Sequence, residues 1–177
     1  DKKYFKRANI IRDKGTDRKS YLSGSKKYYS WIDLGSSFLL GELNSAFLWA
    51  QLEKTKLITT KKIHMWMNYH RKLEKLEIEK KIRRPWLIKN IKHNGHMYYI
   101  ILKSYIERKK LIKKMKKKNI FPVFHYIPLH SSIAGRKFCK TPYRMDVTNN
   151  VYNRILRLPL WIGVNQIKII KALLSIL

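Results

Sequence analysis

The sequence contains few acidic residues, one cysteine and no long hydrophobic run. Its 177 residues include 11 Asp and Glu against 40 Lys and Arg, a formal net charge of +29. A bilayer-spanning helix needs about 20 consecutive apolar residues. No such run is present, so we expect neither a membrane span nor a membrane partner. The lone Cys139 cannot form an internal disulfide, which is typical of a reducing compartment and predicts a cytoplasmic protein.

Several common catalytic motifs are also missing. The sequence has no GxxxxGK[ST] or GxGxxG loop, which excludes the two common glycine-rich phosphate loops. It has no G-x-S-x-G nucleophile turn, so nothing in it supports hydrolase chemistry. His93 and His96 lie close together around Asn94 and Gly95, but no Cys or carboxylate cluster completes a ligand set. We therefore expect no metal site.

The hydrophobic content argues against a disordered basic tail. Hydrophobic residues make up 45% of the chain and aromatic residues 12%, whereas disordered segments have little of either. A folded chain of this length buries roughly 70% of the surface that it exposes when unfolded. The length suits one domain or parts of two.

The excess of basic residues has two interpretations. Basic side chains release counterions when they meet phosphates, which favours a polyanion partner such as nucleic acid. Lys outnumbers Arg by 29 to 11, which instead favours compositional drift in an AT-rich genome, because the Arg fork is the usual phosphate ligand. The densest run, 113–118, follows Arg108 and is interrupted at helical spacing by Met115. It predicts the solvated face of an amphipathic helix, with a nucleic-acid patch as the alternative.

Hydrophobic spacing predicts a helical first half. A short helix is expected at 2–12, ending at Gly15, and a polar loop then extends to Ser30. Over 39–76 the spacing predicts one long helix, or two joined helices that bend at Thr59 and Thr60.

The pattern changes after Pro85 and the polar stretch 89–95. Pro122 is expected to place the start of the second strand at a sheet edge. We predict an α+β unit attached to the long helix, with strands at 97–102, 121–127 and 157–160 and helices at 105–118, 147–155 and 166–174.

The first candidate site is the segment before the long helix. Gly35, Ser36 and Ser37 lead into this helix, and free N–H groups and hydroxyls at a helix N-terminus can bind an anion. The alternative is that Ser36 or Ser37 only caps the helix.

The second candidate site is FHYIPLH, residues 124–130. His125, Tyr126 and His130 place polar aromatic groups at the end of a strand, where functional residues often lie. The alternative is a core tyrosine with two surface histidines that have ordinary partners.

A resemblance to a known family rests on five collinear blocks. These are IIRDKGTDR (10–18), WIDLGSSFLLGELNSAFLWAQLE (31–53), GHMYYIIL (95–102), FPVFHYIPLH (121–130) and RILRLPLW (154–161). Together they resemble the C-terminal half of the DegT/DnrJ/EryC1/StrS sugar aminotransferases, which are pyridoxal-phosphate (PLP) enzymes of fold type I. Within the family, GSSF, WAQLE and VFHYIPLH are similar to the dTDP-4-amino-4,6-dideoxygalactose transaminases of enterobacterial common antigen synthesis.

The resemblance implies an α/β fold, the C-terminal part of fold type I, and a division of the chain into three parts. Residues 1–38 would be the end of the large PLP-binding domain and an interface loop. Residues 39–84 would be a long connecting helix or helix pair, and residues 85–177 an α+β small domain. The implied reaction transfers an amino group from glutamate to C4 of dTDP-4-dehydro-6-deoxyglucose, with PLP as the electron sink. The implied assembly is a homodimer, or a pair with a complementing N-terminal half.

The resemblance also assigns roles to individual residues. It places Ser37, with Ser36 beside it, at the phosphate of the partner subunit's PLP. His125, Tyr126 and His130 would lie near the sugar nucleotide, and Arg18 near the same interface.

Some departures from the family pattern affect the expected activity. The family's Schiff-base lysine lies in the N-terminal half, and no lysine here has its context, so we expect this chain to be inactive alone. The opening DKKYFKRANII lacks an initiator Met, which predicts a fragment or a processed product. Lys14, Gly41 and Asn44 replace residues common in the family and suggest relaxed constraint. The remaining alternatives are a basic nucleic-acid-binding module and a non-functional gene remnant.

Overall fold

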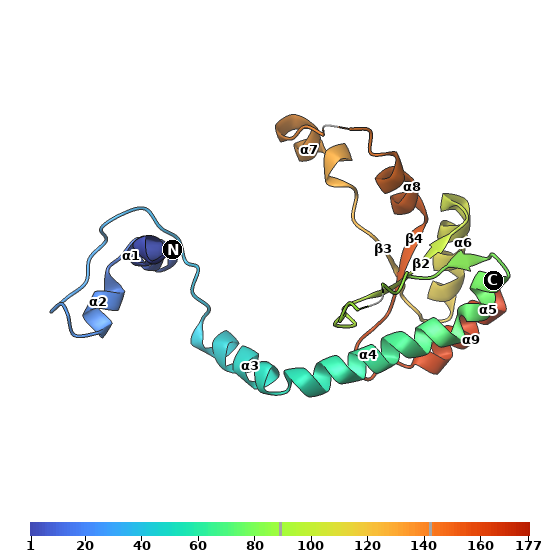
Figure 1. Ribbon diagram of the computed structural model, residues 1–177, viewed down its shortest axis with the longest axis horizontal. Helices are drawn as coiled ribbons and strands as arrows, with labels where there is room; N and C mark the ends of the chain where they lie inside the picture. The colour runs from blue at the N-terminus through green and yellow to red at the C-terminus, as the bar shows by residue number, and fades with distance from the viewer. Residues whose placement is uncertain (89, 142) are drawn as a thin grey trace. The chain divides into compact units, whose positions relative to one another are not determined.

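The computed structural model describes residues 1–88, 90–141 and 143–177, so Lys89, the first residue of the predicted polar stretch, lies outside it. The chain divides into two compact units, an N-terminal unit, Asp1–Lys54, and a C-terminal unit, Thr55–Leu177. The division falls within the predicted connecting segment 39–84, because Lys54 is a turn between two helices. Figure 1 shows the order of the elements along the chain.

Short helices and two paired loops form the N-terminal unit. The elements are η1 (Lys2–Tyr4), α1 (Phe5–Arg12), α2 (Arg18–Leu22) and α3 (Glu42–Glu53). The predicted first helix is confirmed, and Gly15, with φ +75°, ends it by donating its N–H to Ile10 O at 2.8 Å. This left-handed conformation is one that glycine adopts without strain.

Helix α2 lies inside the segment predicted as a polar loop, so that prediction is wrong for residues 18–22. Five residues are too short to show a hydrophobic period. The buried Asp17 lies at the start of α2, where it accepts a bond from Lys26 Nζ and another from Ser30 N at 2.8 Å. These bonds hold the pKa of Asp17 below its ordinary value.

The helices of the N-terminal unit bury none of their described side chains. Helix α3 has the sequence ELNSAFLWAQLE, and its Leu43, Phe47 and Trp49 are 89%, 70% and 68% exposed. A helix that is apolar around most of its circumference is usually buried in a larger structure. The N-terminal unit therefore presents apolar surface that requires a cover.

The C-terminal unit combines a four-stranded sheet with six α-helices in the part of the chain that the structure describes. The helices are α4 (Thr55–Lys72), α5 (Glu74–Ile78), α6 (Tyr105–Lys117), α7 (Ile133–Phe138), α8 (Asp146–Arg154) and α9 (Gln166–Ile176), with a 3-10 turn η2 (Leu129–Ser131). The strands are β1 (Ile82–Arg83), β2 (Tyr98–Leu102), β3 (Val123–Phe124) and β4 (Ile155–Leu158). None of the described helices combines the length and the apolarity that crossing a bilayer requires.

All neighbouring strands are antiparallel, in the order β1-β2-β4-β3. Tyr98 pairs with Leu158 and Ile100 with Leu156, and all four side chains are buried on one face. Side chains alternate between the faces of a strand, so Tyr99 lies on the opposite face. The edge position of β3 confirms the expectation from Pro122.

Helices α4, α6 and α9 contribute to the single described core (Figure 1). In α6, Leu111 and Met115 are buried and the neighbouring lysines are exposed, which confirms the predicted amphipathic helix. Ser104 caps this helix by accepting a bond from Glu107 N at 3.1 Å. Fully buried side chains from the sheet and the helices complete the core, among them Tyr69, Tyr98, Leu111, Met115, Leu156 and Leu173.

Two predicted element boundaries are wrong. The long helical segment breaks at Lys54 and again at Leu73, whereas Thr59 and Thr60 lie inside continuous helix α4. Threonine has only a modestly lower helix propensity than alanine, so two threonines do not end a helix whose later turns pack into the core through Trp66 and Tyr69.

The strand predicted at 121–127 contains only the two residues of β3. Pro122 cannot donate to a ladder, and the partner strand β4 begins at Ile155, two residues before its predicted start. Strand β1 and helix α7 were not predicted, because neither is long enough to show a period.

Aromatic rings cluster around His70 at the centre of the C-terminal unit. The His70 ring stacks on Trp66 with centroids 4.9 Å apart, and its Nδ1 lies 3.5 Å from the Tyr98 hydroxyl. Burial, assisted by the nearby Arg84 charge, lowers the pKa of His70 below its ordinary value. Arg84 is itself paired with Glu77, through Nε at 2.6 Å.

Acidification should destabilise the C-terminal unit through His70. Its folded-state pKa lies below the ordinary 6.5. The unfolded state therefore takes up a proton first, and the free energy of unfolding falls as the pH drops from 6.5 to the folded-state value. We expect His70→Gln to flatten the dependence on pH of the free energy of unfolding, measured by urea titration, as the pH falls below 6.5. His64→Gln, at an exposed position of the same helix, is the control, and an equal flattening by both would contradict the assignment.

Candidate functional site

Two loops of the N-terminal unit meet at a pair of glycines. Gly15 O accepts bonds from Ile32 N at 2.8 Å and from Asp33 N at 3.0 Å. A Cβ on Gly15 would lie 1.7 Å from Asp33 O, and one on Gly35 would lie 2.1 Å from Gly15 N. Because the backbones approach this closely, only glycine fits at either position.

This contact determines the position of the two predicted serines. Ser36 N donates to Ile11 O at 2.9 Å, and Ser36 O accepts from Lys14 N at 3.1 Å. Ser37 forms an isolated antiparallel bridge with Asp13. Its N–H and hydroxyl make no hydrogen bond to any residue that the structure describes, and its side chain is exposed.

The predicted location of these serines at a helix N-terminus is wrong. Helix α3 begins at Glu42 with Gly41 as its N-cap, so neither Ser36 nor Ser37 caps it. The segment instead pairs with the 13–17 loop, because Gly35 permits that approach. Ser37 thus offers a free hydroxyl and a free N–H from a loop held by backbone bonds, a combination suited to an anion.

Arg18 also lies in the N-terminal unit. It is the first residue of α2 and its side chain is exposed. Arg18 N lies 3.5 Å from Thr16 Oγ1, and its guanidinium makes no ion pair with a described residue. Its charge is therefore available for a ligand or a partner, and its predicted place near the sugar-nucleotide interface stays a prediction.

In the C-terminal unit, the predicted residues His125 and Tyr126 line one cavity of about 630 Å³. The chain after β3 and helix α8 supply its walls, which are mostly apolar. His125 Nδ1 is buried and has no hydrogen-bond partner in the part of the chain that the structure describes. A buried polar atom without a partner is costly, so it marks a position where a ligand group can bind.

Tyr126 and His130 complete the predicted set. The ring of Tyr126 meets that of His125 edge to face, with centroids 5.8 Å apart, and its side chain is 79% exposed. Tyr126 is therefore not a core tyrosine. His130 lies in η2, where its Nε2 is 2.9 Å from Asn149 Oδ1 of α8. This bond ties the segment that follows His125 to the opposite wall of the cavity.

Sequence reasoning missed the contribution of α8 to this cavity. Thr148, Val151 and Tyr152 of α8 line it, together with Ile155. Their spacing of three to four residues is that of one helix face. This apolar face was visible in the sequence, but nothing in the sequence indicated which element it contacts.

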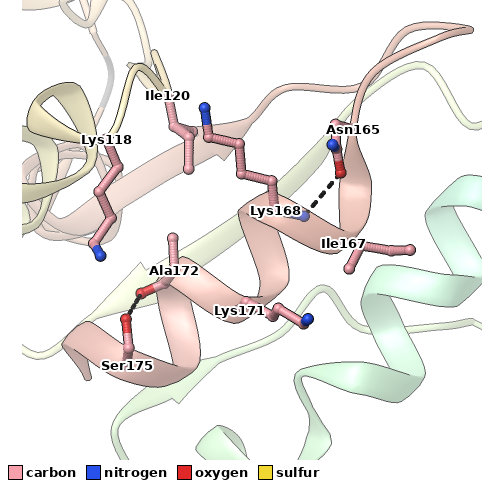
Figure 2. Close-up of a pocket in the computed structure, with 8 residues that line it drawn as sticks. All are labelled: Lys118, Ile120, Asn165, Ile167, Lys168, Lys171, Ala172 and Ser175. Carbon is pink, nitrogen blue, oxygen red and sulfur yellow. Dashed lines mark hydrogen bonds between the residues drawn. The ribbon is translucent and has the colours of Figure 1, made fainter.

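Three lysines surround a second hollow, of about 590 Å³, on α9 (Figure 2). Lys118, Lys168 and Lys171 are exposed there. Its neutral polar groups are already hydrogen-bonded within the protein. Asn165 Oδ1 accepts from Lys168 N at 2.9 Å, and the Ser175 hydroxyl donates to Ala172 O at 3.0 Å. Flexible surface lysines without a fixed polar group make a weaker candidate than the His125 cavity.

No metal site is found among residues 1–88, 90–141 and 143–177. No group of three or more His, Cys, Asp or Glu side chains could hold a metal ion there. Tyr98 of the central strand is fully buried, so its ring cannot stack on a base, whereas Tyr99 on the opposite face is half-buried.

Comparison with known proteins gives a family match over almost the whole chain. The sequence model of the DegT/DnrJ/EryC1/StrS aminotransferase family matches residues 1–174. A curated relative, the uncharacterized protein MJ1066 of Methanocaldococcus jannaschii, is 29% identical over 161 residues, which cover 86% of this chain and 40% of the relative. The chain thus spans less than half the length of that protein.

Solved structures share the fold. The aminotransferase TlmJ of Streptoalloteichus hindustanus matches with a TM-score of 0.81 at 14% identity, over 99% of this chain and 45% of its own. Helicobacter pylori PseC, an aminotransferase of pseudoaminic acid biosynthesis, matches with a TM-score of 0.81 at 19% identity, over 99% of this chain and 46% of its own. Streptococcus pneumoniae Spr1654, solved in a PLP form, matches with a TM-score of 0.77 at 15% identity, over 99% of this chain and 43% of its own. These likenesses confirm the predicted fold class.

Proposed function

Because the chain belongs to the DegT/DnrJ/EryC1/StrS aminotransferase family, we propose that it is the C-terminal part of a PLP-dependent nucleotide-sugar transaminase. The family match over residues 1–174 carries this proposal. The proposed reaction moves an amino group from glutamate to C4 of dTDP-4-dehydro-6-deoxyglucose and gives dTDP-4-amino-4,6-dideoxygalactose. The segments GSSF, WAQLE and VFHYIPLH support this choice of sugar.

The proposal includes a complementing N-terminal half that carries the Schiff-base lysine. The apolar surface of the N-terminal unit supports it, since Leu43, Phe47 and Trp49 of α3 are exposed. Exposed apolar patches of this kind mark surfaces that another part of a structure covers. A homodimer of the completed enzyme would then bring Ser37 to the partner subunit's cofactor.

The residues present fit a cofactor phosphate. Ser37 has a free hydroxyl and a free N–H among the described residues, and Ser36 lies beside it on the same loop. The bonds to Gly15 and Ile11 already hold this loop in place, so binding a phosphate costs little conformational entropy. When bound, PLP supplies the electron sink that amino transfer requires.

The His125 cavity would hold part of the sugar nucleotide. The partnerless Nδ1 of His125 and the exposed hydroxyl of Tyr126 are available for its polar groups. The apolar wall around Val151 and Ile155 excludes water and suits an apolar substituent such as the methyl group of a 6-deoxy sugar.

The decisive experiment supplies the missing half. The 177-residue chain is coexpressed with an N-terminal half of a family member that carries the Schiff-base lysine, and glutamate and dTDP-4-dehydro-6-deoxyglucose are added. We expect 2-oxoglutarate and a 4-amino sugar whose C4 configuration, read by NMR, is galacto. The same complex with that lysine changed to alanine is the control. A folded, PLP-loaded complex without amino transfer would contradict the proposal.

Replacing Ser37 should weaken cofactor retention in that complex. Ser37→Ala removes one hydrogen bond to a charged group, which is worth about 1.5–3 kcal/mol, so PLP should dissociate about tenfold to hundredfold more readily. The measurement is the PLP absorbance that remains after dialysis. Ser175→Ala, at an exposed position of α9 in the C-terminal unit, is the matched control. If both variants retain the same amount of PLP, Ser37 does not bind the cofactor phosphate.

A further inference from the structure

A buried arginine without a carboxylate partner lies beside the His125 cavity. Arg108 is 4% exposed and lies on the inward face of α6, together with Leu111 and Met115. No ion pair joins it to any acidic side chain in the part of the chain that the structure describes. A buried charge that lacks a counterion needs other compensation.

Backbone carbonyls provide part of that compensation. Arg108 Nη1 donates to Tyr152 O at 2.6 Å and lies 3.5 Å from Ile155 O. Tyr152 lies in the last turn of α8, and Ile155 is the C-cap of this helix and the first residue of β4. A helix C-terminus carries partial negative charge and unpaired carbonyls, so the guanidinium caps α8.

Three aromatic rings enclose the same guanidinium. Its central carbon lies 5.2 Å from the ring centroid of Tyr105, 5.7 Å from that of Phe124 and 5.6 Å from that of Tyr152. The faces of such rings attract a cation within about 6 Å. One side chain of α6 thereby contacts both β3 and α8.

Helix α8 forms one wall of the cavity, and β3 leads directly into the other. Phe124 directly precedes His125 in the chain, and Tyr152 and Ile155 line the cavity themselves. We propose that Arg108 is a positioning residue, whose guanidinium sets the spacing between the strand end that carries His125 and the C-terminal end of α8. The importance of this role for catalysis rests on the proposed function, in which this cavity holds the sugar nucleotide.

The chemistry of arginine suits this role better than that of lysine. The planar guanidinium can donate to carbonyls along its edge and contact aromatic rings through its faces at the same time. An ammonium is a compact, strongly hydrated charge that can reach a carbonyl but offers no plane. Arg108→Lys should therefore keep a hydrogen bond to the carbonyls at the end of α8 but lose the stacking contact with the Phe124 ring.

The test compares Arg108→Met, Arg108→Lys and the control Lys110→Met, which removes an exposed charge from the same helix. Hydrogen exchange is followed in the full chain over 121–131 and 146–156, with α4 as the reference. We expect Arg108→Met to accelerate exchange at least about tenfold in these two segments and not in α4, because local openings affect only the elements that lose contacts. Added guanidinium ions should restore part of the protection, and Arg108→Lys should fall between wild type and Arg108→Met.

A second readout separates positioning from general stability. The NMR resonances of the imidazole of His125, followed at one fixed pH, should move in Arg108→Met and stay unchanged in Lys110→Met. Uniformly faster exchange with unchanged His125 resonances would overturn the proposal, and so would unchanged exchange in both segments. If Arg108→Met does not fold, the same two measurements are made on Arg108→Lys, with smaller changes expected in the same direction. Neither readout needs PLP or a substrate, so failure of amino transfer in the reconstituted complex would count against the proposed function alone.

Discussion

Leu173→Ala should destabilise the C-terminal unit by about 2–5 kcal/mol, the usual cost of removing a fully buried leucine from a packed core. Leu173 lies in α9, which contacts α4 and α6, and none of its side chain is exposed. The substitution removes the transfer free energy of three carbon atoms, and the surrounding helices cannot collapse fully into the space that is left. The measurement is urea unfolding of the full chain, followed by its tryptophan fluorescence, because Trp66 is 6% exposed and is the one buried tryptophan of the five.

The adjacent residue provides a matched control. Leu174 is 44% exposed on the same helix. The same substitution there should cost less than about 1 kcal/mol, because much of the side chain remains in water. Similar losses at the two positions would show that α9 does not dock in this orientation. A smaller loss at Leu173 would mean that the core around it is loosely packed.

Gly35→Ala should separate the two loops that place Ser37. The added Cβ would lie 2.1 Å from Gly15 N and 2.8 Å from Ile11 O, and backbone atoms cannot rotate away as a side chain would. The loops must therefore move apart, which breaks the bond from Ile32 N to Gly15 O. Overpacking of this kind costs about 1–3 kcal/mol, so amide exchange over 31–38 should accelerate about tenfold or more.

Gly41→Ala is the control for this substitution. Gly41 has φ −62°, and a Cβ there meets no described atom within 4 Å. Exchange over 31–38 should stay at its wild-type rate in Gly41→Ala. In the reconstituted complex, Gly35→Ala should also release PLP more readily, since it displaces Ser37 without changing it. Unaltered exchange in Gly35→Ala would mean that the two loops are not held against each other.

Residues with a clear period were predicted correctly. Leu111 and Met115 recur on one face of α6, and Tyr98–Leu102 is a continuous apolar strand, so both elements follow from the sequence. Short elements could not be predicted in this way. Strand β1 has two residues and α2 has five, and both depend on partners distant in sequence.

The candidate site was predicted in part. FHYIPLH identified His125 and Tyr126, and the structure brings both to one cavity. The sequence placed Ser36 and Ser37 at the start of a helix, although the close approach of Gly15 and Gly35 holds them in a loop pair. Arg108 was grouped with the surface lysines that follow it, because a basic residue next to a basic run gives no sign of burial.

The sequence by itself determined the longer periodic elements, the charge and the family resemblance, because periodicity, composition and collinear blocks are properties of neighbouring residues. Only the tertiary structure decided which polar groups lack partners. The orphaned Nδ1 of His125, the buried charge of Arg108 and the free N–H of Ser37 all depend on which segments pack together. Such packing joins residues that are far apart in the chain. The free energy that an unpaired polar group or a buried charge costs arises only when packing removes that group from water.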